Sequence, residues 1–111
     1  MMWGKSKDAF NRVVEVVREA EASGNGTLPE DVARAYEATW NARRYELIGS
    51  REWLKAAQWW RIVANNAEER GEEGSPLHRG ARAASDALYE VVRERKAFTA
   101  PNRTREGEQR K

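Results

Sequence analysis

The chain has 111 residues, of which 34% are charged and 40% hydrophobic, and its formal net charge is +2. The length and the hydrophobic fraction fit one folded domain and are unlike those of a disordered chain, which has few apolar residues. The small net charge excludes a strong overall electrostatic attraction to polyanions. With no cysteine and a single histidine, His78, the sequence also excludes disulfides and cysteine- or histidine-based metal clusters, so we expect no cofactor and no metal.

The chain contains no membrane or export signal that we can identify. No stretch approaches the roughly 18 uninterrupted apolar residues of a membrane span, and the opening MMWGKSKDAF lacks a secretory segment. We therefore expect a cytoplasmic protein without membrane contacts. Four segments instead have helical periodicity, each opened by a capping residue and the first three closed by glycine.

The first segment is predicted to be an amphipathic helix from a cap at Ser6 to about Ser23. Its apolar side consists of Phe10, Val13, Val14, Val17 and Ala20. Gly24 is predicted to end this helix in the left-handed conformation, and Asn25-Gly26 to make the turn that follows.

The second segment opens with TLPE, in which Thr27 and Glu30 have the spacing of a capping box. The helix is predicted to extend to Ile48. Its predicted apolar side consists of Leu28, Val32, Ala35, Tyr36, Thr39, Trp40 and Leu47. Arg43 falls within this stripe, so we expect an ion pair with another helix; an interface arginine is the alternative.

The third segment, residues 50–70, carries two adjacent tryptophans in AAQWWRIVANN. Neighbours on a helix point about 100° apart, so Trp59 and Trp60 cannot both lie at the centre of one buried stripe. Trp60 groups with Trp53 and the alanines and is predicted to be core. Trp59 groups with Lys55, Ile62 and Asn66 on the far side.

Two explanations for Trp59 and Ile62 stay open. A central third helix with neighbours on several sides would bury them. Alternatively, they form an exposed aromatic patch that binds another protein or a second copy of the chain.

The fourth segment is predicted to begin with Ser75 as cap and Pro76 at the first helical position, and to run to about Phe98. Its first half places small residues inward, where large tryptophans of a facing helix would fill the space. These small residues are Gly80, Ala81, Ala84 and Ala87.

The short links between the segments favour antiparallel neighbours. We predict an all-α, single-domain four-helix bundle over residues 1–98, either up-and-down or irregular. Residues 99–111 lack an apolar period and are predicted to form a flexible, disordered basic tail.

The sequence favours a protein that is not an enzyme. His78 is predicted to lie at the surface, without a serine or carboxylate at a spacing that would form a relay. We expect a protein-binding module, such as a small inhibitor, adaptor or assembly factor, including those carried by phages and other mobile elements. The predicted partner-binding residues are Trp59, Ile62, Lys55, Asn66, Tyr45 and Arg70.

Nucleic-acid binding is the alternative function. Basic residues interleaved with an aromatic on one helix face can follow a phosphate backbone. The residues that would do so are Arg82, Tyr89, Arg93, Lys96, Arg103 and Arg105. Against this, the neighbouring acidic residues Asp86, Glu90 and Glu94 favour a solvated face with internal ion pairs.

Overall fold

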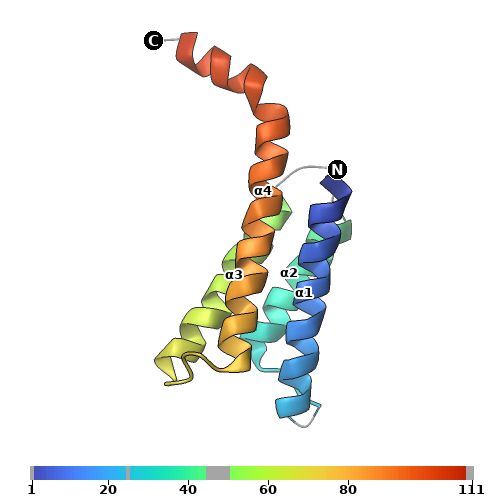
Figure 1. Cartoon of the computed structure of the whole chain (residues 1–111), viewed down its shortest axis with the longest axis vertical. Coiled ribbons are helices and arrows are strands. Elements are labelled where there is room, and N and C mark those ends of the chain that lie inside the picture. The colour runs from blue at the N-terminus through green and yellow to red at the C-terminus, as the bar shows by residue number, and fades with distance from the viewer. Residues whose placement is uncertain (1, 25, 45–50, 110–111) are drawn as a thin grey trace.

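The computed structural model describes residues 2–24, 26–44 and 51–109, with side chains for 6–24, 26–44 and 51–94. The described residues form four helices and no strand: α1 (Met2–Ser23), α2 (Glu30–Arg44), α3 (Arg51–Glu69) and α4 (Pro76–Gln109) (Figure 1). This confirms the predicted all-α four-helix bundle. The predicted end of the second helix at Ile48 lies outside the described residues.

The four helices pack in a ring in which the contact between α1 and α2 is the smallest. α4 packs along both α1 and α3, and α3 also packs along α2, whereas α1 and α2 meet over a much shorter stretch. The backbone of α4 continues past the predicted end at Phe98 to Gln109. This continuation stands clear of the other three helices (Figure 1), and its sequence has no apolar period with which to pack against them.

The core combines large side chains of α3 with small ones of α4. Trp53 and Trp60 are fully buried, as predicted, and so are Ala81 and Ala84 across the interface. On the α1 side, a Cβ added to Gly80 would lie 2.8 Å from Cγ2 of Val16, which is closer than carbon atoms pack. The small residues of α4 therefore let its neighbours approach closely, as the sequence predicts.

Buried hydrogen bonds fix how α3 is rotated against its neighbours. The indole Nε1–H of Trp60 donates to Oγ1 of Thr39 in α2 at 3.0 Å, and the Thr39 hydroxyl donates to the Ala35 carbonyl at 2.8 Å. On the other side, the Ser85 hydroxyl of α4 donates to the Ala57 carbonyl of α3 at 3.0 Å. Each bond satisfies a polar group that would be costly to leave unpaired in the core.

The predicted cap at Ser6 is wrong. α1 begins at Met2, and Ser6 is a buried residue inside the helix. The reason is its spacing: Ser6 lies three residues before Ala9 and seven before Val13, on the same buried stripe. A serine is small enough to pack there.

The left-handed conformation predicted for Gly24 is found instead at Gly26, within the turn predicted to follow the helix. Gly26 has the positive φ, 90°, and Gly24 does not. Gly24 is instead required by close packing, because a Cβ at this position would collide with the carbonyl oxygen of Thr27. The turn therefore needs both glycines for different physical reasons.

The predicted capping box at the start of α2 does not form. The Pro29 carbonyl accepts the first helical hydrogen bond, from the N–H of Ala33 at 3.0 Å, so Thr27 lies too far ahead of the helix to cap it. Glu30 does not reach back to Thr27; its carboxylate binds the guanidinium of Arg34, one turn later, at 3.1 Å.

The ends of the α3–α4 connection are as predicted. Gly71 has a φ of 81°, and its N–H donates to the Glu68 carbonyl at 3.0 Å, which ends α3. Oγ of Ser75 accepts the N–H of His78 at 3.2 Å, and Pro76 is the first residue of α4.

The Trp60 hydrogen bond can be tested with Thr39→Val, which keeps the branched shape but removes the hydroxyl. We expect a loss of about 1–3 kcal/mol in the free energy of unfolding, because the buried indole N–H loses its acceptor. Urea denaturation measures this loss. Thr39→Ser, which keeps the hydroxyl, is the control and should lose less. A Thr39→Val variant as stable as the wild type contradicts the role given to this bond.

Candidate interaction surface

The outward side of α3 carries an apolar centre. Ile62 is 42% exposed and Lys55 is exposed, both on the side of the helix away from Trp60. Trp59 is half-buried: it packs against the core, and the Arg34 guanidinium of α2 lies 6.0 Å from its ring centroid. The prediction that Trp59 faces away from the bundle is therefore corrected, since α2 covers one side of its ring. We call Lys55, Trp59, Ile62 and Asn66 the α3 face.

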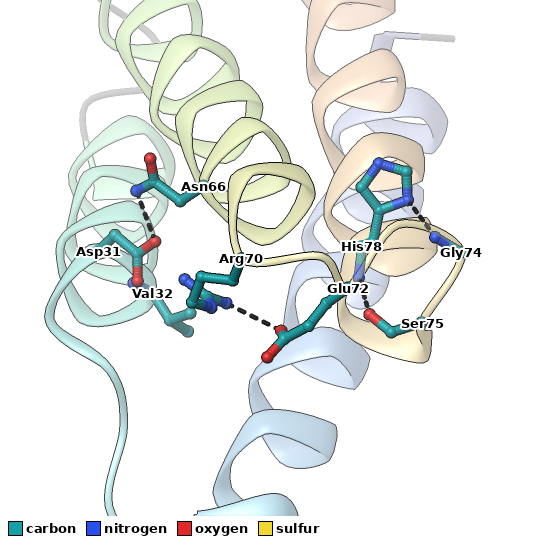
Figure 2. A network of polar contacts seen from close by, with 8 residues as sticks. All are labelled: Asp31, Val32, Asn66, Arg70, Glu72, Gly74, Ser75 and His78. Atoms are coloured by element: carbon teal, nitrogen blue, oxygen red, sulfur yellow. Dashed lines mark hydrogen bonds and ion pairs between the residues drawn. The ribbon is translucent and has the colours of Figure 1, made fainter.

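The other predicted partner-binding residues are partly engaged within the chain. Asn66 Nδ2 donates to Oδ2 of Asp31 at 2.9 Å, which ties the end of α3 to the start of α2 (Figure 2). Arg70 is exposed and forms an ion pair with Glu72 at 3.1 Å (Figure 2). Tyr45 lies outside the described residues. Within the predicted set, Lys55 and Ile62 are thus the exposed members for which the described part of the chain shows no polar partner.

A second apolar group lies at the seam between α1 and α2. Trp40, which the sequence places on the apolar side of its helix, is 44% exposed. Its ring packs edge-on against Phe10, with centroids 4.9 Å apart, and lies 6.3 Å from Tyr36. We call Phe10, Tyr36 and Trp40 the aromatic cluster. It covers the seam where α1 and α2 have their short contact.

The position of Trp40 next to Thr39 in the sequence could have indicated its exposure. Thr39 is fully buried, and its neighbour Trp40 is turned about 100° from it, as Trp59 is from Trp60. Arg43, expected in an ion pair with another helix, is also exposed, and its guanidinium lies 5.1 Å from the Phe10 ring centroid. The face of the Phe10 ring attracts the Arg43 guanidinium, which stays exposed to water. Arg43 therefore does not need the carboxylate partner that the sequence led us to expect.

His78 is buried, and its predicted surface position is wrong. Its Nδ1 accepts the N–H of Gly74 at 3.0 Å, and its Nε2 lies 2.8 Å from Oε2 of Glu68 (Figure 2 shows the Gly74 bond). Because Nδ1 is occupied by a donor, the proton of the neutral imidazole is on Nε2 and is donated to Glu68. The ring therefore joins α3, the connecting loop and α4.

The Glu68 carboxylate is the acceptor for two groups of α4. The Nε2–H bond from His78 lowers the pKa of Glu68 below its ordinary value of 4.5, and Arg82, 3.6 Å away, acts in the same direction. Partial burial opposes this shift. Glu68, His78 and Arg82 thus link the end of α3 to the start of α4, and their polar atoms contact one another.

The described cations of the nucleic-acid hypothesis have carboxylate partners. Arg82 lies beside Glu68, and Arg93 pairs with Glu90 at 2.5 Å, while Tyr89 is half-buried against the core. The side chains of Lys96, Arg103 and Arg105 lie outside the described set. Nucleic-acid binding stays a prediction that no contact in the described part of the chain favours.

Comparisons with known proteins do not assign the chain to a family. No protein-family model, curated protein or solved structure matches the chain significantly. Within the described ranges, no helix has the length and hydropathy needed to cross a membrane, and no group of three or more acidic or histidine side chains is placed to hold a metal ion. Function is therefore inferred from the surface residues.

The Glu68–His78 contact predicts a specific acid sensitivity. Because the folded-state pKa of Glu68 is lowered, the contact stabilises the fold above about pH 4.5 and loses this effect as the pH falls through the lowered value. In urea denaturation, the wild type should exceed Glu68→Gln in stability at neutral pH, and the difference should shrink in acid.

The control for this measurement is the same comparison in a His78→Asn background. Asparagine retains an acceptor for the Gly74 N–H but removes the bond to Glu68, so the acid-dependent part of the difference should become smaller. A difference that is independent of pH in the wild-type background contradicts the assignment.

Proposed function

We propose that the chain is a non-enzymatic protein-binding module, of the kind represented by small inhibitors, adaptors and assembly factors, and that it binds through the α3 face. The observation that supports this most directly is the 42% exposure of Ile62 near the middle of α3, next to the half-buried Trp59. An apolar residue at the centre of an exposed helix face, with an aromatic and a cation beside it, has the composition of a contact surface.

The aromatic cluster is the competing surface, and its contacts favour a structural role. Trp40 already packs against Phe10 and closes the seam between α1 and α2. Ile62 is the other large apolar side chain with high exposure in the described part. Burying a whole isoleucine contributes about 1.5–3 kcal/mol, so covering the exposed part of Ile62 would contribute on the order of 1 kcal/mol to binding.

Trp59 and Arg34 form the edge of this surface on the α2 side. The Arg34 guanidinium is held by the Glu30 carboxylate at 3.1 Å and lies over the Trp59 ring. Side chains that are ordered before binding lose less conformational entropy when a partner arrives. Tryptophan and arginine are also the residues that contribute most often to binding energy at protein interfaces.

The proposal predicts that Ile62→Gln weakens partner binding about five- to tenfold, equivalent to about 1–1.4 kcal/mol, with little change in the thermal midpoint. The measurement is affinity capture from cells that produce the protein, followed by titration of the purified partner. Trp40→Gln is the matched control, because it alters a similarly exposed apolar residue outside the α3 face.

Binding that survives Ile62→Gln but is lost in Trp40→Gln would move the contact to the aromatic cluster. Absence of any protein partner and of self-association would remove the proposal.

A further inference from the structure

α2 and α3 lie antiparallel, so opposite ends of the two helices are neighbours. Asp31, near the start of α2, bonds to Asn66, near the end of α3, at 2.9 Å. Farther along, Thr39 bonds to Trp60 at 3.0 Å. The end of α2 therefore lies toward the start of α3, and the start of α2 lies beside the end of α3.

This arrangement leaves free charges of opposite sign at the two ends of the α2–α3 surface. Arg51 and Lys55 are exposed in the first turns of α3, and Arg44 is exposed in the last turn of α2 at the same end. At the opposite end, Glu69 of α3 is exposed, whereas the exposed Glu30 of α2 is paired with Arg34 at 3.1 Å. The free charges are therefore basic at one end of the surface and acidic, through Glu69, at the other.

The charges on α3 share one stripe with Ile62. At about 100° per residue, Arg51, Lys55, Ile62 and Glu69 fall within about 40° of one another on the helix circumference. In the described part of the chain, Arg51, Lys55 and Glu69 have no ion-pair partner. Ile62 is two residues from the midpoint of α3, which corresponds to about 3 Å along the axis.

We propose that the partner of this surface is a second copy of the chain, docked antiparallel about a twofold axis that passes near Ile62. This inference rests on the proposed function and names its partner. In an antiparallel pair, Arg51 and Lys55 of each copy face Glu69 of the partner subunit, while Ile62 lies near the axis in both. A parallel pair would place like charges together, which is unfavourable.

The dimer should be weak and sensitive to salt. Its contact consists of one face of a helix pair, so the buried area is at the low end for specific interfaces. The ion pairs lie at the rim of this contact and are screened as the salt concentration rises.

The test uses two charge-reversed variants and sedimentation equilibrium at low salt. One variant carries Arg51→Glu and Lys55→Glu, which makes both ends of α3 acidic; the other carries Glu69→Lys, which makes both ends of α3 basic. Each alone should self-associate at least about tenfold more weakly than the wild type. An equimolar mixture should recover the wild-type affinity to within about threefold, because each acidic end then meets a basic one.

A matched control separates this geometry from net charge. Arg12→Glu with Arg18→Glu, and Glu15→Lys alone, change the net charge by the same amounts at exposed positions of α1. When these two α1 variants are mixed, association should increase only as far as their opposite net charges alone would cause. An increase as large as that of the mixed α3 variants would overturn the proposal.

The remaining outcomes also decide the question. A wild-type chain that stays monomeric at the highest attainable concentration, or a mixture of folded variants that does not recover association, overturns the second-copy proposal. If circular dichroism shows that a double substitution unfolds the chain, single Lys55→Glu and Glu69→Lys variants are mixed instead and judged by the same criterion. Ile62-dependent capture of a different protein by a monomeric chain would leave the proposed function standing while removing this inference.

Discussion

The hydrogen bond between Trp60 and Thr39 is the constraint on which the rest of the surface depends. It is buried and 3.0 Å long, and it joins the largest type of side chain in the core to the neighbouring helix. Together with the Ser85–Ala57 bond on the α4 side, it holds α3 from two directions. Once α3 is fixed in rotation, the helix geometry places Trp59 at the α2 edge and Ile62 outside.

Much of the fold follows from the sequence because local chemistry and long-range packing agree there. The Ser75 cap and the glycine at 71 are local signals, and both act as expected. The division between large tryptophans on α3 and small residues on α4 is also visible in the sequence, since two such helices fit one another. Gly80, closely packed against Val16, shows how tight this fit is.

The errors arise where a neighbouring element changes the outcome. Ser6 has the chemistry of a cap but occupies the buried stripe, and Thr27 is displaced from the helix it should cap because the chain begins that helix later. His78 is a lone histidine in the sequence, yet the loop before α4 and the end of α3 enclose it. Periodicity shows which way a residue points, but not which segment covers it; Trp59, half-covered by Arg34, is the same case at the candidate site.

The most direct test of the account is hydrogen exchange at the indole N–H groups of Trp60 and Trp59, measured by NMR and assigned with Trp59→Phe and Trp60→Phe. The Trp60 proton is buried and bonded to Thr39, so it should exchange only through opening of the bundle. The Trp59 proton, on a half-buried ring, should exchange much faster. Equal exchange at the two positions, or stronger protection of Trp59, would contradict the orientation of α3 on which both the fold and the proposed surface depend.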